Sequence, residues 1–239
     1  MKDIDSNRTN GQIAPDEKTQ AVVPVSEKDW IKLQKWYQEN GRHNLPWRKN
    51  RSAWSILLAE VLLRRTRADT VARVYPKISE IFTDAKSVLE YKKEWYQLTA
   101  ELGFPSRFEQ FFLLCEKILS EYNDKLPEKS NELMSLPGLG HYSSDAIRCF
   151  GLNENRFIVD TNTLRLASRI TGNIVEQEKH RSAKARILLE QAFGSEGKMT
   201  ADRNFALLDL AALICTNSNP DCAVCPLFRV CEYGKKLNI

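Results

Sequence analysis

Long apolar runs are absent from this 239-residue sequence. The apolar stretches at residues 56–59 and 210–215 fall far short of the ~20 residues that a transmembrane helix needs. The N-terminal segment MKDIDSNRTNGQ has no apolar core of the kind that secretory signals carry. The sequence therefore predicts a protein that neither crosses a membrane nor is exported.

Strand patterns and repeats are scarce as well. Alternation of apolar and polar residues is confined to residues 157–159, and no stretch is repeated along the chain. No GxxxxGK phosphate-binding loop is present, so a nucleotide cofactor is not expected. Apolar residues recur at helical spacing instead, for example in one buried central helix expected from Trp54 to Tyr75. We therefore expect an all-α protein of many short helices.

Composition sets wide bounds on the architecture. Hydrophobic residues make up 42% of the chain and charged residues 28%, with a mean hydropathy of −0.44. These values exclude collagen and a wholly disordered chain, and they suit one large domain or two small ones. Residues 1–25 are polar and aperiodic and are expected to form a disordered tail. The net charge of +4 permits a polyanionic partner without requiring one.

Six cysteines in a protein without an export signal are expected to be metal ligands or buried thiols rather than disulfides. Cys115 and Cys149 lie among apolar residues of helical patterns and are expected to be core thiols. The other four are spaced C-x6-C-x2-C-x5-C within one loop: Cys215, Cys222, Cys225 and Cys231. Four thiolates so close together suit either a tetrahedral zinc ion or an iron–sulfur cluster, and the spacing leaves both open.

A hairpin is predicted at residues 136–140, where the sequence reads LPGLG between two helical patterns. Its glycines allow a sharp turn that brings backbone N–H groups to the start of the next helix, a natural seat for a phosphate. An ordinary turn between two helices is the alternative.

Two acidic residues are candidates for catalysis. Asp160 follows an apolar stretch and precedes a helical pattern, so it is expected to cap that helix and to lie near the hairpin. Glu60 lies within the run ILLAEVLL, where burial would raise its pKa and Arg64 would lower it. The alternative for Glu60 is a weak surface pair with Arg64, worth ~0.2–0.5 kcal/mol. A third acid, Asp209 in FALLDLAALIC, is expected to be structural.

Several motifs together resemble one family, the helix-hairpin-helix DNA glycosylases of the endonuclease III and adenine-DNA glycosylase superfamily. They occur in the family's order over about residues 30–235. They are LPWR at 45–48, AEVLLRRT at 59–66, LPGLGHYSSDAI at 136–147, VDTNTLRL at 159–166 and the four-cysteine loop.

The resemblance implies a two-lobed, all-α fold. Residues 50–155 would form a six-helix barrel domain that carries the helix-hairpin-helix, and residues 26–49 and 156–239 would form an iron–sulfur domain. In this family the cysteine loop ligates a [4Fe-4S] cluster. The expected partner is double-stranded DNA with a mismatched or modified base. We also expect a monomer that, in a prokaryotic cell, is cytoplasmic and nucleoid-associated.

The resemblance also assigns roles to three residues. Asp160 matches the essential aspartate, and Glu60 matches the glutamate in the base pocket of adenine and thymine-mismatch glycosylases. Tyr142 stands where strand-nicking members carry a lysine, so a monofunctional glycosylase is expected. Adenine-specific members usually have serine there, whereas thymine-DNA glycosylases have tyrosine and share LLRRT. Adenine glycosylases that recognise oxidised guanine also continue into a further domain, whereas this chain ends eight residues after Cys231.

The sequence therefore predicts removal of thymine or uracil opposite guanine. The alternatives are an adenine glycosylase acting opposite guanine or oxidised guanine, a glycosylase for a modified base, and a non-catalytic DNA-binding protein on the same scaffold.

DNA contacts are expected at three places. Arg64, Arg65 and Thr66 match side chains that enter the duplex, and the turn Leu102, Gly103 and Phe104 resembles one that wedges into the minor groove. The hairpin would contact phosphates through Pro137, Gly138, Leu139, Gly140, His141 and Ser143. Further candidate phosphate contacts are Arg48, Arg107, Arg148, Arg165 and Lys184.

Overall fold

The structure is a computed structural model that describes residues 25–103, 105–173 and 182–237. Helices make up the regular structure of this part, and no strand occurs in it, so the all-α prediction is confirmed. The expected N-terminal tail lies outside the described residues except for Val25. That residue is buried and donates its backbone N–H to the carbonyl of Ala192 at 2.8 Å. No described helix is both long enough and apolar enough to span a membrane.

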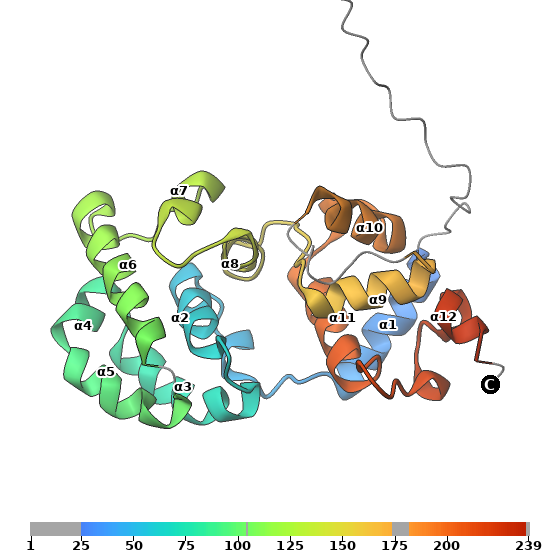
Figure 1. Ribbon diagram of the computed structural model, residues 1–239, viewed down its shortest axis with the longest axis horizontal. Coiled ribbons are helices and arrows are strands. Elements are labelled where there is room, and N and C mark those ends of the chain that lie inside the picture. Colours follow the sequence, from blue (N-terminus) through green and yellow to red (C-terminus); the bar gives the residue numbers. More distant parts are fainter. Residues whose placement is uncertain (1–24, 104, 174–181, 238–239) are drawn as a thin grey trace, which may run out of the picture.

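The helices lie in two groups beside one another (Figure 1). The first group follows the chain without interruption. Its members are α2 (Ala53–Leu63), α3 (Ala68–Ile81), α4 (Ala85–Glu90), α5 (Lys92–Thr99), α6 (Ser106–Tyr122), α7 (Ser130–Ser135) and α8 (His141–Ala146), which continues into a π-helical turn at Ile147–Gly151.

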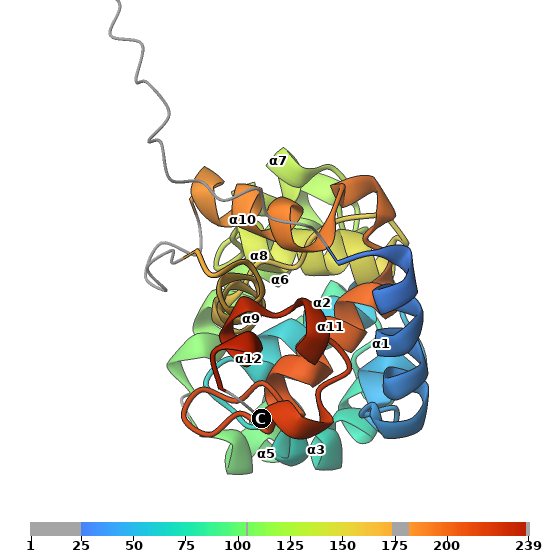
Figure 2. The same cartoon turned by 90° about the vertical axis from the view of Figure 1, so that its right-hand side faces the viewer.

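The second group combines both ends of the described chain. In Figure 2, α1 from the beginning of the chain lies beside α11 near its end. The members are α1 (Glu27–Asn40), α9 (Thr161–Thr171), α10 (Ala183–Phe193), α11 (Ala201–Leu213) and α12 (Glu232–Lys235). The domain boundaries expected at residues 50 and 155 fall in the two connections between the groups and stay predictions.

Helix α2 is the centre of the first group. The Ser52 side chain caps it by accepting from the backbone of Ser55, and seven of its eleven residues are buried. Helices α3, α6 and α8 surround it, which explains why apolar residues lie on nearly all its faces. The helix ends at Leu63, so the prediction of one helix from Trp54 to Tyr75 is wrong. The chain turns at residues 64–67, where Arg65 adopts a left-handed backbone with φ of 55°, and continues as α3.

A buried ion pair joins the segment before α2 to the second group. Both carboxylate oxygens of Asp209, in α11, accept from the Arg48 guanidinium, at 2.7 and 2.9 Å. The backbone N–H and Nε of Arg42 donate to the same carboxylate at 2.8 and 2.7 Å. Burial acts to raise the pKa of Asp209, but the hydrogen bonds and charges of Arg48 and Arg42 outweigh it and hold the pKa low. The structural role expected for Asp209 agrees with this geometry.

We predict that Asp209→Asn lowers the free energy of unfolding by about 3–5 kcal/mol, because Arg48 would remain buried without a counter-charge. Urea denaturation of the purified protein measures this change. Asp202→Asn is the matched control, since Asp202 is 70% exposed and faces Arg51 at 3.7 Å. Its effect should stay below about 1 kcal/mol. Equal effects of the two substitutions would contradict the importance of the buried pair.

Candidate active site

The hairpin between α7 and α8 is held from both sides. Leu136 and Leu139 anchor it because their side chains are buried in the core. Gly138 has a φ of +78°, a left-handed conformation that favours glycine. Arg64, at the end of α2, donates from Nη2 to the Gly138 carbonyl oxygen. The first backbone N–H groups of α8, which begins at His141, are thereby presented beside α2.

Asp160 caps α9, as expected. Its Oδ1 accepts from the backbone N–H groups of Asn162 at 3.0 Å and Thr163 at 2.7 Å. Its Oδ2 accepts from Nδ2 of Asn162 at 2.8 Å. Three hydrogen-bond donors therefore fix the position of the carboxylate.

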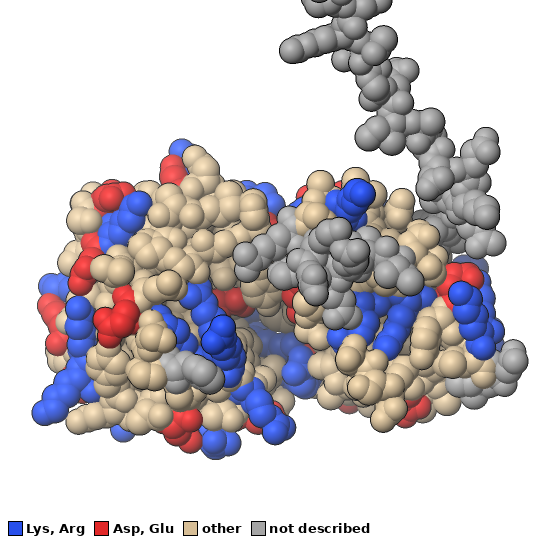
Figure 3. All heavy atoms as spheres, in the orientation of Figure 1, with Lys and Arg blue, Asp and Glu red and all other residues tan. Residues whose placement is uncertain are grey.

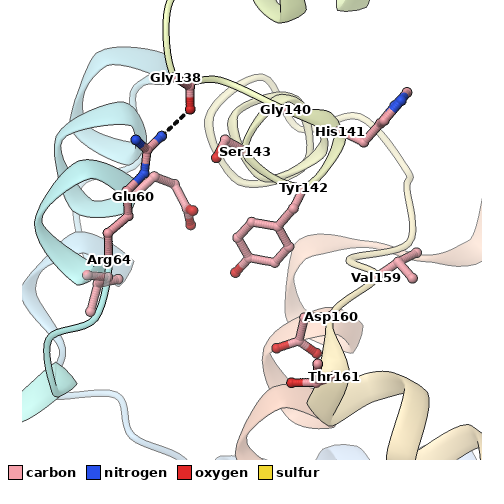
Figure 4. A pocket seen from close by; sticks show the side chains of 11 residues that line it. Glu60, Arg64, Gly138, Gly140, His141, Tyr142, Ser143, Val159, Asp160 and Thr161 are labelled. Carbon is pink, nitrogen blue, oxygen red and sulfur yellow. Dashed lines mark hydrogen bonds between the residues drawn. The ribbon is translucent and has the colours of Figure 1, made fainter. Parts of the chain in front are cut away.

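Glu60, Tyr142 and Asp160 meet in one cavity of about 640 Å³. The Tyr142 hydroxyl points into the space between the two carboxyl groups (Figure 4). The cavity lies where the two groups of helices face each other, and Lys and Arg side chains gather around the hollow there (Figure 3). A second cavity of about 300 Å³ shares Glu60, Leu63 and Tyr142 with the first and extends toward Trp47. The three residues proposed for catalysis are thus brought together.

Glu60 differs from Asp160 in having no hydrogen-bond donor among the described residues. Burial raises its pKa to about 8, the nearby charge of Asp160 acts in the same direction, and Arg64 opposes both. The surface pair with Arg64 is not formed, because Arg64 reaches the hairpin instead. Glu60 is therefore largely protonated near neutral pH and can donate a hydrogen bond.

Tyr142 is the residue that faces both carboxyl groups. The charge of Glu60, together with burial and the charge of Asp160, raises the pKa of the Tyr142 phenol well above its ordinary value. The phenol therefore keeps its proton over the whole physiological range of pH.

A chain of hydrogen bonds runs from Asp160 to the cysteine loop. Asn162 Oδ1 accepts from Arg165 Nη1 at 3.1 Å, while its Nδ2 holds Asp160. Arg165 then donates from Nε to the carbonyl of Cys215 at 3.0 Å and from Nη2 to that of Ala211 at 2.8 Å. Sequence reasoning missed this role of Arg165, although its position three residues after Asn162 places both on one face of α9.

The four loop cysteines lie around one small apolar pocket beside α9 and α12. Arg169 Nη1 lies 3.2 Å from Cys215 Sγ and supplies a positive charge there. In the described residues, no three His, Cys, Asp or Glu side chains are arranged to hold a single metal ion. Cys115 and Cys149 are buried elsewhere in the core, as expected.

Four of the five expected phosphate contacts stay predictions, and the structure shows each of these arginines donating to a group inside the protein. Arg48 pairs with Asp209, Arg165 holds the Cys215 carbonyl, and Arg148 pairs with Glu154 at 2.7 Å. Arg107 is buried and donates to the turn at residues 64–66. Only Lys184 of the five is exposed.

The expected DNA-contacting residues are only partly presented to solvent. Arg64, Gly138, Gly140, His141 and Ser143 line the cavity.

Thr66 lines the second cavity, and Arg65 and Gly103 are exposed. Pro137 is half-buried in the hairpin. The side chains of Leu102 and Leu139 are buried in the core, so they support their turns rather than project from them. Phe104 lies outside the described residues.

Comparison with known proteins gives similarity over most of the chain. No family model matches the sequence. Thymine/uracil-DNA glycosylase of Methanothermobacter thermautotrophicus is 30% identical over 197 residues, which cover 82% of this chain and 88% of the relative. Adenine DNA glycosylase of Buchnera aphidicola subsp. Schizaphis graminum is 30% identical over 205 residues, which cover 85% of this chain and 58% of the relative. The structure of a thermostable thymine-DNA glycosylase superposes with a TM-score of 0.76 at 26% identity and covers 88% of this chain and 98% of that one.

The raised pKa of Glu60 predicts a pH-dependent effect of Glu60→Gln on stability. Between the ordinary pKa of a glutamate and about 8, the folded chain keeps a proton that the unfolded chain releases, so wild-type stability falls as pH rises. Glutamine does not titrate, so the Tm of the variant minus the Tm of the wild type should increase from pH 5 to pH 9. The increase should be roughly 4 °C or more.

Thermal denaturation at both pH values measures the effect, with Glu80→Gln on the exposed face of α3 as control. A Tm difference between Glu60→Gln and wild type that is the same at pH 5 and pH 9 would contradict a raised pKa.

Proposed function

Since the chain belongs to the helix-hairpin-helix superfamily of DNA glycosylases, we propose that it excises thymine or uracil opposite guanine and leaves the strand unbroken. As a base excision repair glycosylase it hydrolyses N-glycosidic bonds, and it binds double-stranded DNA. The choice of base and of opposite base, and action as a monomer, are part of the proposal.

The proposal rests on one observation: the carboxyl groups of Glu60 and Asp160 lie in one cavity with the phenol of Tyr142. A glycosylase that nicks the strand needs an amine to form a Schiff base with the sugar. None of the residues described around the cavity is a lysine, and Tyr142 cannot supply this chemistry. Hydrolysis by water is then the reaction that the cavity supports.

Asp160 stabilises the charge that develops on the sugar. As the base departs, the sugar acquires positive charge, as in other glycoside hydrolyses. The three donors to Asp160 fix its carboxylate in place, so it needs no reorganisation during the reaction.

Glu60 assists the departing base. Thymine and uracil carry carbonyl oxygens, which accept hydrogen bonds, and a protonated Glu60 is a donor. Two carboxyl groups in unlike surroundings can divide the work of acid and anion. Mispairing helps as well, because a mispaired base costs less to extrude from the duplex.

The test is a panel of duplexes with G:T, G:U, G:A and oxidised-G:A pairs, each incubated with protein and then cleaved with alkali at abasic sites. We expect cleavage of G:T and G:U strands only after alkali, at a rate that falls above pH ~8 as Glu60 loses its proton. Asp160→Asn should lower the rate about 100-fold or more, whereas Asp69→Asn, an exposed acid in α3, should not change it.

Release of adenine without release of a pyrimidine would contradict the proposed base and favour the adenine alternative. Cleavage without alkali would contradict the unbroken strand. Binding without any base release would favour a non-catalytic protein.

We also propose that Cys215, Cys222, Cys225 and Cys231 hold a [4Fe-4S] cluster. Four thiols around one apolar pocket match its Cys₄ ligand set, and the Arg169 guanidinium beside Cys215 offsets the negative charge of thiolate ligands. When bound, the cluster supplies cross-links between the loop segments, not redox chemistry at the sugar.

Purified wild-type protein should contain ~4 iron atoms per chain and absorb broadly in the visible range. Cys225→Ala should lose both the iron and the absorbance, while Cys115→Ala, which removes a core thiol outside the loop, should keep them. Elemental analysis that finds zinc without iron would contradict the cluster.

A further inference from the structure

Two turns of unusual backbone geometry lie next to each other near the cavity. The first, residues 64–66, separates α2 from α3, and the second, residues 102–103, follows α5. Arg65 has a φ of 55° and Gly103 a φ of 66°, and both residues are exposed. A side chain at Gly103 would meet no atom within 4 Å, so this turn faces open space.

One buried side chain ties these two turns together. Arg107, in the first turn of α6, is 8% exposed. Its Nη1 donates to the Arg64 carbonyl and, at 2.8 Å, to Thr66 Oγ1. Its Nη2 donates to the Leu102 carbonyl at 3.3 Å. Every acceptor of this guanidinium therefore belongs to one of the two turns.

Stability alone does not explain an arginine at this position. No described carboxylate pairs with Arg107, and its Nε is buried without a hydrogen-bond partner. Burying a charge against neutral acceptors is costly, and an unpaired buried N–H costs about 1–3 kcal/mol. A rigid planar fork does, however, hold several acceptors in a fixed relative geometry, which a lysine cannot do.

We propose that Arg107 is a positioning residue that makes the turns at residues 64–66 and 102–103 one rigid wedge for duplex DNA. Extruding a nucleotide leaves a gap in the base stack, and proteins hold such steps open with elements inserted between the bases. Arg64 and Thr66 border the cavities that would receive the extruded nucleotide, so the wedge stands beside the gap. The inference rests on the proposed function, because it assumes a duplex substrate.

The test measures base extrusion separately from excision. An Asp160→Asn background blocks excision, and 2-aminopurine next to the thymine of a G:T duplex fluoresces when the stack opens. At saturating protein, Arg107→Gln should lower this signal about 10-fold, and Arg107→Lys should lower it less. Arg73→Gln is the matched control, because Arg73 is an exposed arginine that pairs with Glu101, next to the second turn.

A second comparison separates positioning from general damage. With Asp160 intact, Arg107→Gln should slow excision from a G:U pair about 10-fold, but should slow it far less when uracil faces an abasic site, where no partner base must be unstacked. Thr66→Val removes one acceptor of Arg107 and should also slow excision from the G:U pair more than from uracil opposite an abasic site, by a smaller factor. This variant replaces Arg107→Gln in the test if Arg107→Gln does not fold.

An unchanged 2-aminopurine signal in folded Arg107 variants would overturn the inference, as would an equal loss of excision from both uracil duplexes. If the wild type releases no base from any duplex, the proposed function fails. Comparing 2-aminopurine fluorescence between the Arg107 variants and their parent still tests the wedge in that case, because the signal comes from protein bound to DNA and needs no base release.

Discussion

Short helices leave many backbone carbonyl groups unpaired at their ends, and buried or half-buried arginines satisfy those that shape this site. Arg64 binds the Gly138 carbonyl, Arg107 binds carbonyls of two turns, and Arg165 binds those of Ala211 and Cys215. The planar guanidinium groups of Arg107 and Arg165 each fix several acceptors at once. The hairpin and the turn after α2 are therefore held beside the active-site cavity, and the cysteine loop is held against α9. Arg48 joins the segment before α2 to α11 through the Asp209 carboxylate.

The active-site chemistry depends on the contrast between two carboxyl groups. Asp160 accepts from three donors at a helix N-terminus, whereas Glu60 lies in an apolar helix with no described donor. The same functional group is held by hydrogen bonds at one position and has its pKa raised by burial at the other. The phenol of Tyr142 lies between them and stays protonated. The fold thus produces two chemical roles from one type of side chain through local polarity alone.

Local patterns predicted much of the fold and of the site. Helical periodicity gave the all-α class, and the residue types around Asp160 and residues 136–140 gave the cap and the hairpin. The break after Leu63 could not be predicted, because the sequence there contains no glycine or proline and the side chain that hydrogen-bonds to the turn, Arg107, lies more than 40 residues away. The acceptors of Arg48, Arg107, Arg148 and Arg165 could not be predicted for the same reason, because the sequence shows a charge, whereas its hydrogen-bond partner is set by tertiary contacts.

The position of α1 beside α11 has a consequence for synthesis of the chain. Helices α2 to α8 are contiguous, so they can pack as soon as residues 53–151 have left the ribosome. Helix α1 is made first, yet the face that it covers exists only after α11 has been translated, more than 160 residues later. The apolar side of α1, which includes Trp30 and Leu33, is thus exposed in the nascent chain for most of its synthesis, and chaperones have their longest opportunity to bind there.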